Sequence, residues 1–128
     1  IPVLAAIIRD DQNRLLIAKR KSGLPRGGYW EFPGGKLQSG ESPEEGIQRE
    51  INEELGMGIL VEDPAGIVAH KYPDVEILLI AYNCRSEDRV DKSHDHDDVQ
   101  WVSAENLKDY IFSEADKKLI ALLNRKTI

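Results

Sequence analysis

GKLQSGESPEEGIQREINEELGM, residues 35–57, is the stretch that decides the fold. Its middle predicts a helix, because Ser42-Pro43-Glu44-Glu45 is a capping box with proline at the first helical position. Gly56 suits the left-handed cap that would end this helix. Isoleucine or leucine recurs at every fourth position and predicts a buried stripe, formed by Ile47, Ile51 and Leu55.

Three glutamates of this helix, Glu50, Glu53 and Glu54, are spaced i, i+3 and i+4 and therefore project from one face. Carboxylates so close together repel one another, and a hard divalent cation such as Mg²⁺ relieves that repulsion. Arg49 can pair with Glu53, four residues on, or hold the loop that carries Glu41. The alternative is that the glutamates form only the solvated face of an amphipathic helix. Gly35 and Glu41, which lie before the helix at fixed offsets from these glutamates, favour the metal site.

These offsets match a known signature at every specified position: Gly35, Glu41, Arg49-Glu50-Ile51, Glu53-Glu54 and Gly56-Met57. The chain resembles the Nudix hydrolases, which cleave diphosphate linkages in nucleotides. WEFPGGK at residues 30–36 and FSEADKKLIALL at residues 112–123 resemble the MutT branch, whose members convert nucleoside triphosphates to monophosphates and pyrophosphate. The resemblance implies an α/β fold, the Nudix α/β/α sandwich with a mixed β-sheet. It also implies Mg²⁺ as the cofactor, with Mn²⁺ as a second candidate.

The resemblance also assigns roles to individual residues. The implied metal ligands are Glu50, Glu53, Glu54 and the carbonyl group of Gly35, and Arg49 orients them. For the base that activates water we expect Glu53, with Asp95, six residues before Trp101, as the second candidate. The residues expected around the nucleobase are Arg20, Phe32 and Asp116.

Asp116 departs from MutT itself, which has asparagine there, whereas relatives that resemble the CTP pyrophosphohydrolases carry aspartate. An ionised carboxylate only accepts hydrogen bonds, so Asp116 would favour a base edge that presents donors, such as an exocyclic amine. The alternative is structural, since Ser113-Glu114-Ala115-Asp116 can form a capping box at the start of the last helix. One aspartate could satisfy both roles.

The leading expectation for function is hydrolysis of a nucleoside triphosphate, with an oxidised purine nucleotide such as 8-oxo-dGTP as a candidate substrate and a link to DNA repair. CTP or dCTP is the alternative substrate. A non-catalytic nucleotide-sensing module on a Nudix scaffold is the alternative from a different class. The complete set of glutamates speaks against that module, because binding alone does not require groups that activate water.

Length and composition restrict the partners. A chain of 128 residues suits one domain over residues 1–128. The formal net charge of -6 disfavours a surface for a nucleic-acid polymer, so we expect a small-molecule nucleotide. We expect no membrane role, because no apolar run could span a bilayer. With no export signal visible and Cys84 as the only cysteine, a reducing cytoplasm is expected, and the sequence predicts no particular oligomeric state.

Apolar runs elsewhere predict a sheet. Residues 2–8 and 14–19 flank a turn-rich tetrapeptide and are expected to form a hairpin. We expect a charged loop over residues 85–98, whose histidines and aspartates are solvated rather than bound to a transition metal. The remaining expected elements are a short extended piece at 30–35, strands at 59–61, 66–70, 76–82 and 99–102, and a closing helix over 113–123.

Overall fold

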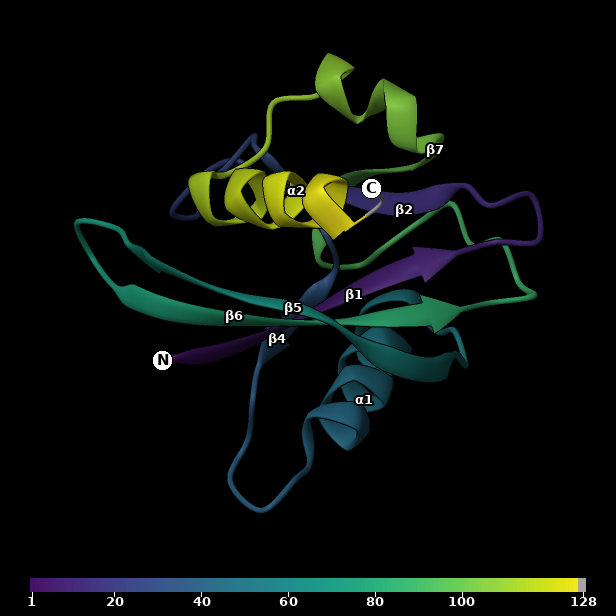
Figure 1. Ribbon diagram of the computed structural model, residues 1–128, viewed down its shortest axis with the longest axis horizontal. Coiled ribbons are helices and arrows are strands. Elements are labelled where there is room, and N and C mark those ends of the chain that lie inside the picture. The colour runs from purple at the N-terminus through teal and green to yellow at the C-terminus, as the bar shows by residue number, and fades with distance from the viewer. Residues whose placement is uncertain (127–128) are drawn as a thin grey trace.

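The computed structural model describes residues 1–126 and shows a mixed β-sheet with a helix on each face (Figure 1). α1 (Pro43–Leu55) covers one face and α2 (Glu114–Lys126) covers the other. The predicted α/β/α sandwich is therefore confirmed. The other elements are β1 (Pro2–Arg9), β2 (Leu15–Arg20), β3 (Trp30–Glu31), β4 (Gly34–Lys36), β5 (Leu60–Lys71), β6 (Glu76–Arg85), β7 (His96–Val102) and a short 3-10 helix, η1 (Ala104–Asp109).

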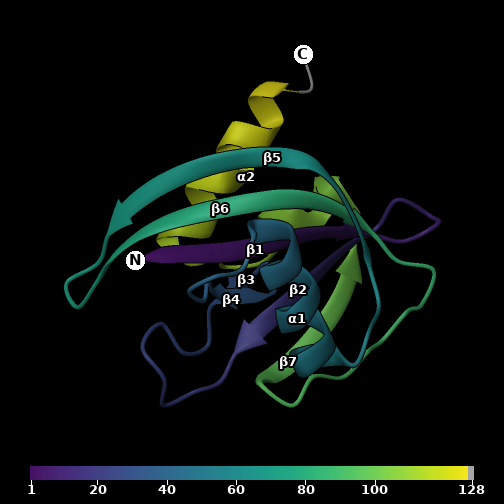
Figure 2. The same ribbon diagram turned by 90° about the horizontal axis from the view of Figure 1, so that it is seen from below.

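β1 is the central strand. It pairs in parallel with β6 along its whole length, while its other edge pairs antiparallel with β4 near its start and with β2 at its end. The predicted hairpin is therefore correct only beside its turn, where Arg9 lies opposite Leu15. Beyond that point β2 separates from β1 and pairs antiparallel with β7 along its length. Seen from below, β5 and β6 curve together along one side of the sheet, and β2 and β7 form the other side (Figure 2).

α1 forms for the reasons that its sequence predicts. The Ser42 hydroxyl accepts the backbone N–H of Glu45, and the Glu45 carboxylate accepts that of Ser42, which completes the capping box. Gly56 ends the helix with φ at 65°, a conformation that costs glycine little. α1 and α2 have 13 residues each, and no helix within residues 1–126 is long and apolar enough to cross a membrane.

Each face of the sheet has its own hydrophobic core, because successive side chains of a strand point to opposite faces. The core under α1 contains Leu4, Ala6, Ile8, Leu16, Ile47, Ile51, Leu55 and Met57. The core under α2 contains Ala5, Ile7, Ile17, Phe32, Leu79, Phe112 and Leu119. The predicted stripe of α1 is thus buried as expected.

Several element boundaries differ from the sequence-based expectation. The two strands expected at residues 59–61 and 66–70 are parts of one continuous strand, β5. Its pairing with β6 shifts in register around Pro64, so the strand continues past the proline and stays in the sheet. The charged loop is shorter than expected, since β6 extends to Arg85 and β7 begins at His96. The expected solvation of His96 is wrong, because its side chain is buried. η1 is not predicted from the sequence, and α2 continues to Lys126.

Candidate active site

The backbone at Gly35, in β4, lies directly against α1. A Cβ atom at this position would lie 2.5 Å from Cδ of Glu50 and 2.6 Å from each carboxylate oxygen. Any larger residue would force the Glu50 side chain to move. The glycine of the signature is therefore explained by a close approach between a strand backbone and a helix carboxylate.

Arg49 gathers the acidic side chains of this region. Its guanidinium donates to Glu41 at 2.8 and 3.0 Å, to Glu50 at 2.9 Å and to Glu53 at 3.3 Å. It also donates to the carbonyl oxygen of Lys36 at 3.3 Å. The hydrogen bonds from Arg49 are the main cause that lowers the pKa of Glu41 to about 2. The structure contains both pairings expected for Arg49, with Glu53 and with the loop of Glu41.

Glu54 is the buried member of the acidic face, because only 8% of its side chain is exposed, whereas 57% of the Glu53 side chain is exposed. Burial raises the pKa of Glu54 far above its usual range, and the nearby carboxylates of Glu50, Glu31 and Asp95 raise it further. Ionising Glu54 is therefore costly while its negative neighbours are uncompensated. A divalent cation among these groups would remove that cost.

The donors at this face suit a hard divalent cation, since carboxylate and carbonyl oxygens are the ligands that Mg²⁺ prefers. Within residues 1–126, no three His, Cys, Asp or Glu side chains are already grouped as a complete metal-binding set. The fit rests on the chemistry of the donors and on the space that Gly35 leaves for the Glu50 carboxylate.

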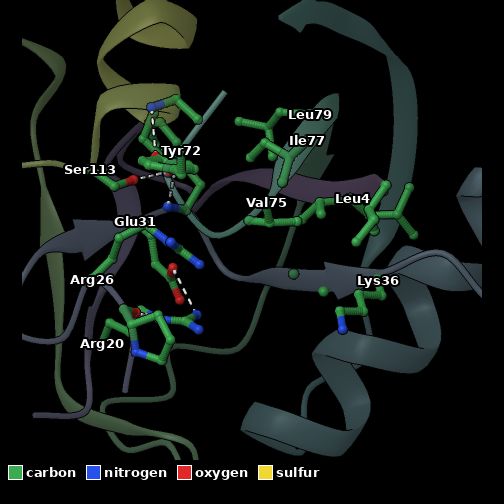
Figure 3. Close-up of a pocket in the computed structure, with 18 of the residues that line it drawn as sticks. Leu4, Arg20, Arg26, Glu31, Lys36, Tyr72, Val75, Ile77, Leu79 and Ser113 are labelled. Atoms are coloured by element: carbon green, nitrogen blue, oxygen red, sulfur yellow. Dashed lines mark hydrogen bonds and ion pairs between the residues drawn. The ribbon is translucent and has the colours of Figure 1, made fainter. Parts of the chain in front are cut away.

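A cleft of about 360 Å³ opens beside Gly35 (Figure 3). The three residues expected around the nucleobase, Arg20, Phe32 and Asp116, all line this cleft, together with Gly35. In Figure 3 Leu4, Val75, Ile77 and Leu79 lie on one side of the cleft together with Lys36, and Arg20, Arg26 and Glu31 lie on the other. One cleft thus adjoins the acidic helix and contains the expected base-recognition residues.

Asp116 lies in the cleft wall and is only 6% exposed. Its carboxylate accepts the backbone N–H of Phe32 at 3.1 Å and the Ser113 hydroxyl at 2.6 Å. Burial raises the pKa of Asp116 to about 7, and the charge of Glu31 adds to the rise, while these two hydrogen bonds lower it. The expected capping box is wrong in detail, because the backbone N–H of Ser113 donates to the carbonyl of Trp30 instead.

Phe32 and Arg20 present different groups to the cleft. The ring of Phe32 is 3% exposed and packs against Phe112 with ring centroids 5.7 Å apart, so it belongs mainly to the core. Arg20 is half-buried, donates from Nε to the carbonyl of Pro25 at 2.7 Å and lies 3.6 Å from Glu31. Its position beside the cleft is thus fixed at two points.

Three polar residues of this region are not predicted from the sequence. Arg26 lines the cleft, lies 4.3 Å above the ring of Tyr72 and pairs with Asp74 at 2.9 Å. Glu31 pairs with Arg20 and also with the ring of His96, at 3.0 Å. Glu31 directly precedes Phe32, a residue expected beside the base, and this position in the sequence could have indicated that Glu31 lies near the cleft. His96 carries no such signal, because it follows an acidic loop.

Comparison with known proteins agrees with this geometry. Residues 4–122 match the family model described as the NUDIX domain. The chain belongs to this family. Nudix hydrolases generally use a divalent metal ion, typically Mg²⁺.

Relatives place this Nudix hydrolase among the MutT-like members. A CTP pyrophosphohydrolase of Escherichia coli (strain K12) is 32% identical over 120 residues, which cover 94% of this chain and 88% of the relative. An 8-oxo-dGTP diphosphatase of Proteus vulgaris is 42% identical over 77 residues, 60% of this chain and 69% of the relative. The crystal structure of a MutT protein from Methanosarcina mazei Go1 matches with a TM-score of 0.89 and 27% identity, over 99% of this chain and 94% of that one.

Proposed function

We propose that this Nudix hydrolase converts a nucleoside triphosphate to the monophosphate and pyrophosphate, with Mg²⁺ as cofactor and Mn²⁺ as a second candidate. One observation carries the proposal. Gly35 belongs both to the signature, where it adjoins Glu50, and to the wall of the cleft that contains Asp116. A nucleotide with its phosphates near Glu50 and its base near Asp116 would use both ends of this site.

The phosphate end of the site would act through charge. A bound divalent cation supplies charge neutralisation on the phosphates and acidifies water. Glu50, Glu53 and Glu54, with the carbonyl of Gly35, would hold that cation. Arg49 keeps Glu50 and Glu53 in place through bonds of 2.9 and 3.3 Å, so these carboxylates are oriented before the substrate arrives.

Glu53 is the proposed general base. Its side chain is 57% exposed, and Arg49, at 3.3 Å, is its only hydrogen-bond partner among residues 1–126, so it retains capacity to accept a proton from water. Asp95 is the second candidate, because it is exposed and its charge acts on Glu54. Either carboxylate would need to lie within hydrogen-bonding distance of the attacking water in the complex.

The leading substrate is an oxidised purine nucleotide such as 8-oxo-dGTP, whose removal in the cytoplasm would serve DNA repair. CTP or dCTP is the alternative, and Asp116 suits either base, because cytosine and 8-oxoguanine both present an exocyclic amine. Each oxygen of that carboxylate already accepts one hydrogen bond and can accept another from an exocyclic amine. Relatives that align with most of the chain carry both names, a CTP pyrophosphohydrolase over 94% of it and 8-oxo-dGTP diphosphatases over 98% and 99%.

Pyrophosphate release from a panel of canonical and oxidised nucleoside triphosphates tests the proposal. We expect turnover with Mg²⁺, monophosphate and pyrophosphate as products, and at least about a tenfold preference for one base, the size of effect of one well-placed hydrogen bond to a charged group. Saturable binding of these nucleotides without turnover would favour the nucleotide-sensing module instead. Orthophosphate as the product would exclude a pyrophosphohydrolase.

A further inference from the structure

His96 connects the cleft to α1 from the first position of β7. Its side chain is only 3% exposed, although the residues on either side of it are exposed. Nε2 of the ring lies 3.0 Å from Oε2 of Glu31, and Nδ1 lies 2.8 Å from the Ser93 hydroxyl. Nδ1 is also 3.9 Å from Oε1 of Glu54, beyond hydrogen-bonding distance. The imidazole is therefore held by Glu31 of the cleft and by Ser93, and it lies beside Glu54 of the acidic helix.

The carboxylate of Glu31 sets the direction of these hydrogen bonds. A carboxylate only accepts, so Nε2 of His96 carries a hydrogen and donates it to Glu31. In the neutral ring Nδ1 is then the acceptor and receives the hydroxyl hydrogen of Ser93, whose oxygen accepts the backbone N–H of Asp95 at 3.2 Å. Ser93 thus orients the ring through Nδ1, and the ring holds the Glu31 carboxylate through Nε2.

Glu31 stands between the two ends of the site. It lines the cleft, and its charge acts both on Asp116 in the cleft wall and on Glu54 in α1. Two strands supply its partners: Arg20 from β2, shown by a dashed line in Figure 3, and His96 from β7. A shift in register after Lys19 sets Arg20 opposite His96, so an irregularity of the sheet brings both partners to the same carboxylate.

We propose that His96 is a positioning residue: its Nε2–H holds the Glu31 carboxylate at the junction of the cleft and the acidic helix, and the efficiency of nucleotide hydrolysis depends on that hold. His96 does not touch the substrate in this role, since Glu31 lies between them. The inference rests on the proposed function, because hydrolysis is one of its readouts. It adds a residue that lies outside the signature and outside the residues expected around the base.

Three substitutions of His96 separate positioning from packing. Glutamine can place its amide nitrogen near the position of Nε2 and reach Glu31, asparagine reaches only the position of Nδ1, and leucine removes all polar contacts. We expect His96→Leu and His96→Asn to lower kcat/KM about tenfold to a hundredfold, and His96→Gln to restore most of it. His94→Leu is the matched control and should leave kcat/KM unchanged, since the His94 side chain is exposed.

A second measurement does not depend on turnover. We expect His96→Leu and His96→Asn to raise the Kd for the monophosphate product, measured by calorimetry without a divalent metal, while His96→Gln stays near wild type. In a Glu31→Ala background, His96→Asn should change kcat/KM less than about twofold, because the carboxylate that His96 holds is already gone.

Two results would overturn the inference. One is equal activity of the asparagine and glutamine variants, a comparison that remains available if the leucine variant does not fold. The other is an undiminished effect of His96→Asn when Glu31 is already alanine, which would mean that His96 acts through packing. Failure of the proposed function looks different, because the wild-type protein itself would then release no pyrophosphate.

Discussion

Gly35 and Glu50 are in contact across the junction of β4 and α1, and the contact leaves no room for even a methyl group. A Cβ atom on residue 35 would lie 2.5 Å from Cδ of Glu50. The signature therefore specifies glycine at this position for a steric reason, and the same contact joins the strand that borders the cleft to the helix that carries the acidic face.

Replacing Gly35 with alanine should displace the Glu50 carboxylate, because a side chain moves more easily than a paired strand. We expect kcat/KM to fall by about a hundredfold, similar to the loss of a residue that orients metal ligands. Gly58→Ala is the control, since a Cβ atom there would meet nothing within 4 Å. Steady-state kinetics of both variants test this, and equal activities would contradict the steric explanation.

We expect Glu54 to destabilise the folded protein while no cation is bound. Its raised pKa means that folding at neutral pH requires either uptake of a proton or burial of a charge. Glu54→Gln removes this cost, and we expect it to raise the free energy of unfolding by about 1 kcal/mol or more. Urea unfolding in EDTA at pH 7 measures it. A less stable variant would show that the Glu54 carboxylate is not under this strain.

Asp116 should make stability depend on pH. Its pKa is about 7 in the folded chain, whereas an unperturbed aspartate has a pKa of 3.8, so the folded state keeps a proton that the unfolded state has lost. The stabilisation from this proton is complete below about pH 4 and disappears as the pH rises through about 7. The free energy of unfolding of the wild type should therefore decline relative to Asp116→Asn across this range. Urea titrations at several pH values test it, and a constant difference would contradict the assignment.

Local rules were sufficient to predict α1 and its role. The capping box, Gly56 and the stripe through Ile47 all depend on residues close together in the sequence, and each is present in the structure. The shared cleft of Arg20 and Asp116 followed from a resemblance and not from local rules, because these residues are far apart in the chain. The capping-box alternative for Asp116 is wrong because the carbonyl of Trp30, in β3, accepts the N–H of Ser113.

The parts that sequence could not predict depend on register. The position of His96 follows from the shift in the β2–β7 ladder after Lys19, and such a shift leaves no period in the sequence. The continuity of β5 depends on irregular pairing around Pro64, where propensity predicts a break. Residues in an acidic stretch are usually solvated, so the burial of His96 differs from what the sequence predicts.

Glu53 should be the carboxylate that activates water. Glu53→Gln keeps the shape of the side chain but removes its basicity, so kcat should fall at least about a hundredfold with little change in KM. Asp95→Asn is measured in parallel, and its kcat should fall less than about tenfold if Asp95 is not the base. A larger loss of kcat in Asp95→Asn than in Glu53→Gln would instead identify Asp95 as the general base.

The central claim is that the acidic face of α1 binds a divalent cation, and titration of the protein with Mn²⁺, followed by electron paramagnetic resonance, tests it most directly. We predict saturable binding to the wild type and to Glu44→Gln, whose exposed side chain lies in the first turn of α1. Binding should weaken at least about tenfold in Glu50→Gln and in Glu54→Gln, because each substitution removes a ligand charge. Equal binding by all four proteins, or none by the wild type, would contradict the account.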